Sequence, residues 1–265
     1  MLYTDSKYDF LDRDNCIRFN GSAFERTYAV EMFIEENENS KTRISHKAFV
    51  KVLEVRNDAY LVSVVLWNFL INDREPDLIL EQLAQKCRRP IENLEFLVNR
   101  KWQIIGLENH DLILESWQKT KKRVEQEYSG DIFDRYVSAQ DQVIRNKQVL
   151  LEKLKKDVFL TQYFSPVYDS AFSNFAFSAT ENLKVLNLDY TVDVVFLLSD
   201  EKQHENLKIL KTLDAKSPNL REMPIESYNS EYELDANSAI KSIRGKFANH
   251  GRKFSFNINQ DNSAA

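Results

Sequence analysis

A chain of 265 residues is long enough to bury a substantial core, and its length favours two domains. Its 36 basic and 41 acidic residues give a net charge of −5, which excludes a polycation that binds nucleic acid over its whole surface, so any such contact must come from a local patch. Five glycines, five prolines and 29% charged residues favour long helices with solvated faces and argue against a low-complexity chain.

Cysteine usage and hydropathy indicate the compartment. The isolated Cys16 and Cys87 exclude a disulfide framework and fit a reducing environment. The charged residues near the N-terminus argue against a signal peptide, and the most apolar window, residues 59–71, is too short to span a bilayer. The sequence therefore predicts a cytoplasmic protein without membrane association.

The first expected element is a strand, in an N-terminal segment formed by residues 1–44. Tyr28, Val30, Met32 and Ile34 alternate with polar residues, which is typical of a half-buried strand. Downstream, Ser45 is expected to cap a helix. Residues 57–71 are interpreted as a further helix, although the valines of that stretch suit a buried strand equally well.

Residues 77–114 carry the clearest local pattern. One helical face is predicted from Leu80, Leu83, Ala84 and Cys87, and a second from Ile91, Leu94, Leu97 and Val98. Pro90 lies between them, and because proline lacks an amide hydrogen it suits the start of the second helix and ends the first. Two short strands, Trp102–Ile105 and Asp111–Leu114, are expected to follow as a hairpin.

Two short helices joined by a tight turn and followed by such a hairpin resemble a winged helix-turn-helix domain, here over residues 45–115. The resemblance implies a fold that is used both to bind DNA and to join proteins, and it implies no particular family.

A helical connector is expected at residues 116–160, with a break at Gly130. Apolar residues recur every seven positions between Tyr136 and Val158, which suits either an ordinary amphipathic helix or a homodimer through a 131–158 coiled coil. Residues 161–265 are interpreted as a C-terminal α+β domain. In it we expect a strand at 186–198, helices at 201–213 and after Asp235, and a closing strand at 254–258.

Basic residues near the predicted domain suggest a nucleic-acid-binding surface. The N-terminus of the predicted recognition helix offers free backbone amides and basic side chains to phosphate. Further basic residues flank the predicted hairpin. The candidate contacts are Arg88, Arg89, Arg100, Lys101, Lys119, Lys121, Lys122 and Arg123. Glu92 and Glu95 on the same helix oppose this interpretation, because carboxylates are repelled by phosphate.

A second basic patch lies near the C-terminus, where residues 236–260 contain no acidic residue. Its members are Lys241, Arg244, Lys246, Arg252 and Lys253. The interleaved Phe247, Phe254 and Phe256 could stack on bases, but their spacing favours a place in the core.

Catalytic signals are poor. His46, His110, His204 and His250 lack metal-ligand spacing, the glycines form no phosphate loop, and Cys87 suits packing better than nucleophilic chemistry. Asp189 and Asp193 share one strand face, which suits a solvated surface better than a carboxylate pair. We therefore expect no enzyme, no cofactor and no metal.

The sequence as a whole predicts an α+β protein with a winged helix-turn-helix domain, a long helical connector and a C-terminal α+β domain. The favoured function is association with DNA, directly or as an accessory subunit in replication, regulation or defence. The alternative is a protein–protein interaction subunit of a larger assembly, and protein partners are expected in either case.

Overall fold

One antiparallel sheet runs through the described part of the chain. The computed structural model describes residues 11, 14–19, 21, 24–37, 40–185, 188–199, 206–215, 225–249 and 251–264. Within these ranges eleven strands pair in the order β5-β4-β3-β2-β1-β11-β10-β9-β8-β7-β6. The strands are β1 (Glu25–Asn37), β2 (Ser40–Val55), β3 (Ala59–Ile71), β4 (Asn93–Asn99), β5 (Ile104–Leu107), β6 (Ala176–Val185), β7 (Leu188–Leu198), β8 (Leu207–Leu213), β9 (Ser227–Leu234), β10 (Ile240–Asn249) and β11 (Arg252–Gln260).

Along the chain, the α-helices lie between β3 and β4 and between β5 and β6. The α-helices in the described ranges are α1 (Ile79–Arg88), α2 (His110–Glu127), α3 (Asp131–Arg145), α4 (Lys147–Leu154) and α5 (Val158–Tyr163). Short 3-10 turns, η2 (Arg89–Ile91) and η4 (Asn262–Ala264), complete the elements. None of the helices in the described ranges combines the length and apolar character needed to cross a bilayer.

The sheet has an apolar inner face and a polar outer face. Along β2, the inward Ala48 and Val50 are fully buried, whereas the outward Lys47 and Lys51 pair with carboxylates at the surface. The same alternation holds on β11, where Phe254, Phe256 and Ile258 are all buried. Alternation with period two puts every second side chain on one face, so one side of the sheet forms the core.

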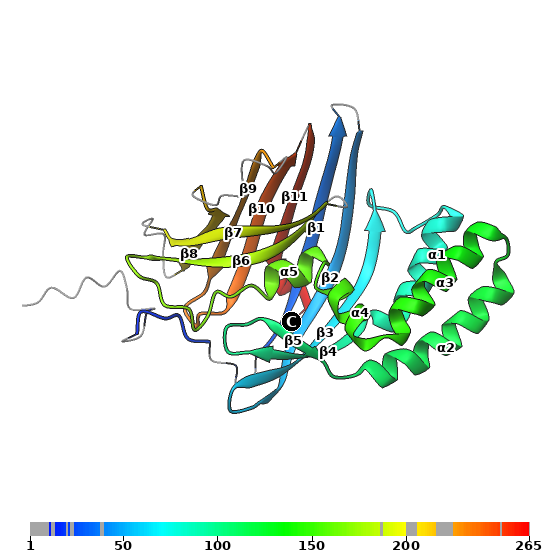
Figure 1. Ribbon diagram of the computed structural model, residues 1–265, viewed down its shortest axis with the longest axis horizontal. Helices are drawn as coiled ribbons and strands as arrows, with labels where there is room; N and C mark the ends of the chain where they lie inside the picture. Colours follow the sequence, from blue (N-terminus) through cyan, green and yellow to red (C-terminus); the bar gives the residue numbers. More distant parts are fainter. Residues whose placement is uncertain are drawn as a thin grey trace, which may run out of the picture.

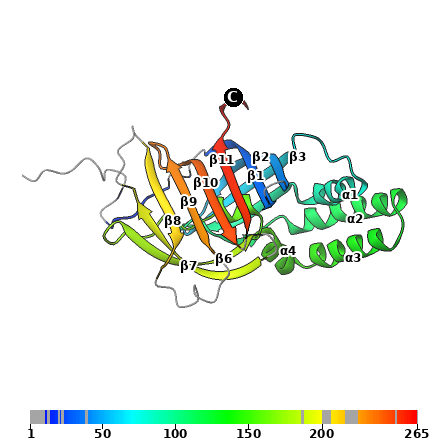
Figure 2. The ribbon, with the colours of Figure 1, turned by 90° about the horizontal axis from the view of Figure 1, so that it is seen from above.

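Curvature turns this inner face into a trough. Figures 1 and 2 show the β6–β7 hairpin crossing over the inner face opposite β1, β10 and β11, with α5 between them. Tyr163 of α5 contacts Tyr28 of β1, with hydroxyl oxygens 3.2 Å apart, and the backbone carbonyl of Gln162 accepts from the Tyr232 hydroxyl of β9 at 3.0 Å. The helix α5 therefore lies inside the trough and joins its two walls.

The remaining helices lie beside the sheet, beyond β3 (Figure 1). Both α1 and α3 pack on α2, and α4 packs on α3. Trp117 of α2 is fully buried and donates its indole N–H to Asp141 of α3 at 2.8 Å. Asn146 accepts from the amides of Gln148 and Val149 at the start of α4, which ends α3 and turns the chain.

The winged helix-turn-helix prediction is wrong. Its first helix exists as α1, but the second is strand β4, whose inward Leu94, Phe96 and Val98 are buried against β3. Pro90 is the second residue of the turn η2 and begins no α-helix. The second strand of the expected hairpin is the first turn of α2, so there is no wing.

Several other expected helices are strands. Residues 45–55 belong to β2, and residues 59–71 form β3, the alternative that their valines allowed. The expected 201–213 helix is β8 in its described part, and Asp235 precedes the strand β10. Strands were confirmed at β1, β7 and β11, as were the helices on either side of Gly130.

The heptad-like seam is covered within the chain. The helix expected over residues 131–158 is divided at Asn146 into α3 and α4. Leu150, Leu151 and Leu154 are each no more than 6% exposed in the single chain. Burial inside the chain favours the amphipathic-helix interpretation over a coiled-coil dimer. The domain boundaries near residues 44, 115 and 160 stay predictions. Strands on both sides of each boundary belong to the one sheet.

Candidate functional site

The trough itself is filled by the protein's own aromatic side chains. Trp102, which follows β4, is 1% exposed and stacks on Phe164, with ring centroids 5.7 Å apart. Phe159 and Tyr163 of α5 stack on each other at 5.2 Å above β1. The deepest part of the sheet is therefore a packed core.

An apolar crevice lies at the border between the sheet and the helices. Its volume is about 490 Å³, and its walls come from β3, α1, α3, α4 and α5. The apolar lining includes Leu66, Ala84, Cys87, Val143, Leu150 and Leu154. Both α1 and α3 contribute lining residues, and both pack on α2, so α2 holds the helical wall of the crevice together.

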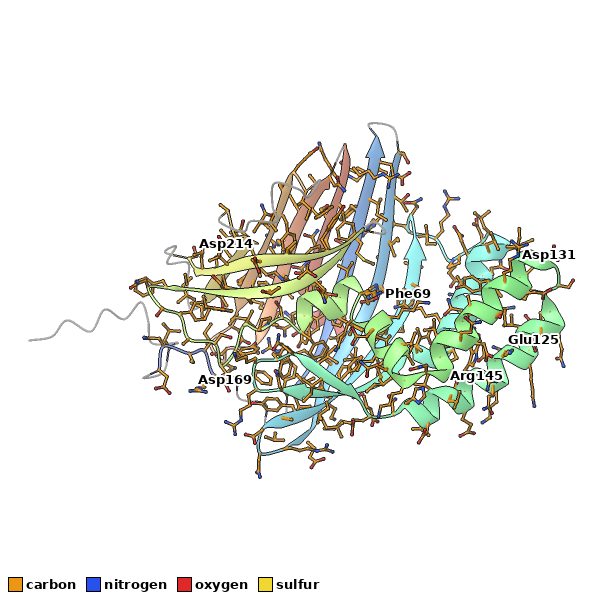
Figure 3. The ribbon with its side chains drawn as sticks, viewed as in Figure 1. Phe69, Glu125, Asp131, Arg145, Asp169 and Asp214 are labelled. Carbon is orange, nitrogen blue, oxygen red and sulfur yellow. The ribbon has the colours of Figure 1, made fainter. Side chains whose placement is uncertain are left out.

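One end of the crevice carries Arg88, the last residue of α1. Its guanidinium carbon lies 3.3 Å from the centroid of the Phe69 ring, and Figure 3 shows Phe69 at the border between sheet and helices. Burial lowers the pKa of Arg88, while the carboxylates of Asp157 and Glu92 act in the opposite direction. The Arg88 guanidinium makes no hydrogen bond or ion pair to any residue that the structure describes.

His46 of β2 packs against the same phenylalanine. The His46 and Phe69 ring centroids are 4.6 Å apart with 23° between the planes, and His46 is 3% exposed. Neither ring nitrogen has a hydrogen-bond partner among the described residues. Burial lowers the pKa of His46 to about 4, so the ring is neutral at physiological pH.

A second groove, of about 650 Å³, lies between the two edges of the sheet. Gln103 and Ile104 line it next to β5, and Thr180 and Glu181 line it from β6. Lys155 pairs with Glu152 at 3.1 Å, and Glu181 pairs with Lys211. The polar lining makes this groove a hydrated seam and a poor site for an apolar molecule.

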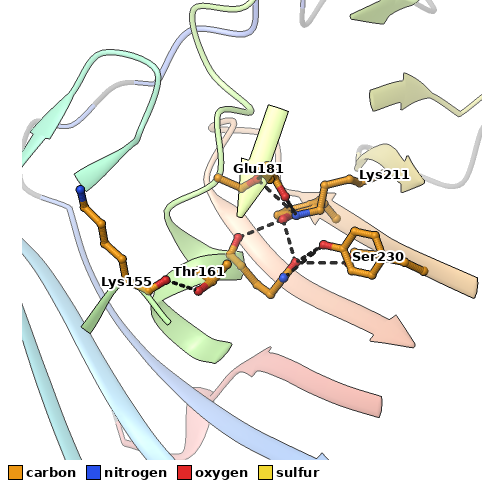
Figure 4. A network of polar contacts seen from close by, with 9 residues as sticks. Lys155, Thr161, Glu181, Lys211 and Ser230 are labelled. Carbon is orange, nitrogen blue, oxygen red and sulfur yellow. Dashed lines mark hydrogen bonds and ion pairs between the residues drawn. The ribbon is translucent and has the colours of Figure 1, made fainter. Parts of the chain in front are cut away.

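A buried ion pair closes the floor of that seam (Figure 4). Lys211 of β8 is fully buried, and its ammonium nitrogen lies 3.1 Å from Glu181 Oε2. Ser165, just after α5, donates to Glu181 Oε1 at 2.8 Å. Burial lowers the pKa of Lys211, but the Glu181 carboxylate and two neighbouring phenols outweigh it, so the pKa is raised and the ammonium stays charged.

The first predicted basic cluster is spread over three elements. Arg88 and Arg89 lie at the junction of α1 and η2, Arg100 and Lys101 in the turn after β4, and Lys119, Lys121, Lys122 and Arg123 on α2. Arg100 Nε donates to the Asn57 carbonyl at 3.0 Å. Lys119 pairs with Glu115 at 2.6 Å and Lys121 with Asp141 at 3.2 Å. With strand β4 in place of a recognition helix, the inference of a nucleic-acid-binding winged helix is withdrawn.

Most of the second patch lies on the outer face of β10 and β11, and Arg252 is the first residue of β11. Lys241, Arg244, Lys246, Arg252 and Lys253 are exposed, and Lys241 pairs with Glu233 at 2.9 Å. The interleaved Phe247, Phe254 and Phe256 are buried on the inner face, which confirms their place in the core.

The remaining candidates do not converge. His110 Nε2 lies 2.8 Å from the Ile144 carbonyl, and no group of three metal-ligating side chains occurs in the described ranges. His204, His250 and the Asp189 side chain lie outside the described residues. Cys16 and Cys87 are both buried free thiols, and burial raises the pKa of Cys87 to about 11.

Sequence reasoning noted the Ala84 and Cys87 face of α1 and singled out Arg88, but it assigned Arg88 to phosphate. It missed the crevice, because the other walls come from residues between Leu66 and Leu160 that no local pattern connects.

Similarity to known proteins is confined to structure. No protein-family model and no curated protein matches the chain. A structure of lipovitellin, described by its lipid–protein interactions, has a TM-score of 0.49 at 8% identity, covering 89% of this chain and 25% of its own. The chain thus spans a quarter of the lipovitellin chain.

Two bacterial structures show weaker likeness. An outer membrane lipoprotein-sorting protein domain from Vibrio parahaemolyticus has a TM-score of 0.22 at 8% identity, covering 90% of this chain and 86% of its own. A LolA superfamily protein from Nitrosomonas europaea has a TM-score of 0.23 at 9% identity, covering 97% and 92%. All three TM-scores lie below 0.5, and the comparisons assign the chain to no family.

Proposed function

We propose that this protein is a non-enzymatic binding protein for a small hydrophobic molecule, which it holds in the crevice between the sheet and the helices. The observation that carries the proposal is the crevice itself, with a volume of about 490 Å³ and apolar walls from five elements. Ligand pockets are of this size, and they combine a mostly apolar lining with a few polar groups that fix orientation.

The expected affinity follows from the burial of apolar surface. Each buried methylene contributes about 0.8 kcal/mol, so ten of them contribute about 8 kcal/mol. Association costs at least about 4 kcal/mol in lost translational and rotational freedom. The net gain from ten methylenes is then at most about 4 kcal/mol, so the alkyl chain alone should bind with a Kd of about 1 mM or weaker, and contacts to its head group must supply any tighter binding.

The residues of the crevice favour binding over catalysis. The Cys87 thiol has its pKa raised to about 11 by burial, so it is protonated at neutral pH and a poor nucleophile. The Asp157 carboxylate accepts from the Leu160 amide at 3.2 Å as the N-cap of α5. No general base is thereby placed against an activated nucleophile.

Titration with N-phenyl-1-naphthylamine, an uncharged apolar probe, tests the proposal. We expect the probe's own emission to rise on binding to the wild-type protein. Ala84 lines the crevice and is itself exposed, so an Ala84→Trp indole should occupy the space and weaken probe binding at least tenfold.

Leu80→Trp is the matched control. Leu80 lies on the same helix, is 54% exposed and does not line the crevice, so this variant should bind the probe like the wild type. Equal probe binding by the Ala84→Trp variant and the wild type would contradict the proposed site.

A further inference from the structure

We infer that the ligand of this crevice is an anionic single-chain amphiphile, whose alkyl chain lies between α1 and α3 and whose acidic head binds the Arg88 guanidinium. The inference rests on the proposed function and names the chemical class of the ligand.

The charge of the lining is opposite in sign to that of the protein. Arg88 and Lys153 line the crevice without an ion pair to any described residue, and Asp157 supplies the one carboxylate among the described lining residues. The chain as a whole carries a net charge of −5. A local excess of cations at an apolar site in an acidic protein favours an anionic ligand over a neutral or cationic one.

Arg88 is the cation best placed to bind an acidic head. Its guanidinium carbon lies over the Phe69 ring, 3.3 Å from the ring centroid, and this contact holds the group beside the ring. A guanidinium presents five N–H donors in a rigid fork that fits a carboxylate or phosphate in bidentate geometry. In the described residues no carboxylate or carbonyl accepts from these donors.

An unpaired cation that is half-buried loses hydration without a compensating partner. The nearest acidic groups do not supply one. Asp157 caps α5, and Glu92 is itself half-buried beyond η2, with burial raising its pKa. A ligand carboxylate would provide the charge-assisted hydrogen bonds that the protein does not.

The neighbouring groups support the same assignment. Lys153, exposed at the rim, donates only to the neutral side-chain oxygen of Gln140, at 3.2 Å, so its charge is also not neutralised. His46, which also packs against Phe69, is neutral, so it neither attracts nor repels a charged head group. The volume of about 490 Å³ suits one alkyl chain with a small head.

The inference is tested by displacing bound N-phenyl-1-naphthylamine with three ligands that share one chain, at about pH 7.5: dodecanoate and dodecylammonium below their micelle concentrations, and dodecanol below its solubility limit. With the wild-type protein we expect dodecanoate to displace the probe at an at least tenfold lower concentration than dodecanol. Dodecylammonium should need the highest concentration. Added salt should reduce the difference in affinity between dodecanoate and dodecanol, because the charged contact is partly exposed.

Arg88→Gln should bring the ratio of dodecanoate to dodecanol affinity close to one, and Arg88→Lys should restore part of it. Arg89→Gln is the matched control, since Arg89 is exposed and does not line the crevice, and it should keep the wild-type ratio.

Equal affinity of the wild-type protein for dodecanoate and dodecanol would overturn the inference and leave the proposed function standing. Failure of the probe and all three ligands to bind would instead remove the proposed function, and the inference with it. If Arg88→Gln does not fold, the three-ligand series on the wild-type protein still decides.

Discussion

At the scale of single residues, His46 shows most clearly that a polar side chain on the inner face loses its hydration when it packs in the core. A buried imidazole without a hydrogen-bond partner is held neutral by its surroundings, at the cost of its affinity for protons. The sequence predicted a helix after Ser45, so it did not predict the place of His46 on strand β2. The burial of His46 follows from contacts with Phe69 and with Phe159 of α5, which local patterns did not connect to it.

His46 should therefore make the protein less stable in acid. Its pKa in the folded protein is about 4, below the ordinary value of 6.5, so the unfolded chain binds the proton first. This contribution is fully present above about pH 6.5 and is lost as pH falls towards 4, by as much as about 3 kcal/mol.

Urea unfolding of the wild type and His46→Leu at pH 7 and pH 4.5 measures this effect. The leucine variant should lose less free energy of unfolding between the two pH values than the wild type. An identical loss in both proteins would show that His46 does not titrate with a lowered pKa.

At the scale of elements, two of the strands that were predicted as helices, β8 and β10, each have an inward position without an apolar side chain. On β8, the inward positions are Leu207, Ile209, Lys211 and Leu213, and the buried lysine breaks the alternation so that Leu207, Leu210 and Leu213 mimic helical spacing. On β10, the inward Gly245 has the same effect between Ile243 and Phe247.

Both exceptions have a tertiary cause. A Cβ built at Gly245 would lie 2.2 Å from the ring of Phe256 on β11, so the ring takes the place of a side chain there. Lys211 is tolerated because Glu181 of β6 lies beside it. Long alternating strands such as β7 and β11, without such exceptions, were predictable from the sequence, and so were α2 and the break at Gly130.

The Lys211–Glu181 pair should be a strong link between α5 and the strands around it, because Ser165 is bonded to both partners. Lys211→Met leaves the Glu181 carboxylate without its cation in a largely buried place, which should lower the free energy of unfolding by about 3 kcal/mol or more.

The double variant Lys211→Met/Glu181→Leu should recover at least half of that loss, since it removes the unpaired charge. Denaturant unfolding of the two single variants and the double variant gives the coupling. Additive losses would mean that the pair does not act as a unit.

At the scale of the whole molecule, the site is built from segments that are far apart in the sequence. Leu66 of β3, the end of α4 and Leu160 of α5 line it together, and α1 and α3 complete the walls. The curved sheet carries α5 on its inner face, with the other helices beside it (Figures 1 and 2). Nucleic-acid association was predicted because Arg88 was taken to open a recognition helix. The structure places it at the end of α1, beside Phe69 and facing apolar walls.

The central claim is that the crevice holds an alkyl chain. The most direct test is a crystal structure of the protein with 12-bromododecanoate, in which anomalous scattering locates the bromine at the end of the chain. The account predicts a bromine peak among Leu66, Cys87, Val143 and Leu154. A peak in the seam between β5 and β6, or no ordered bromine at saturating ligand, would contradict it.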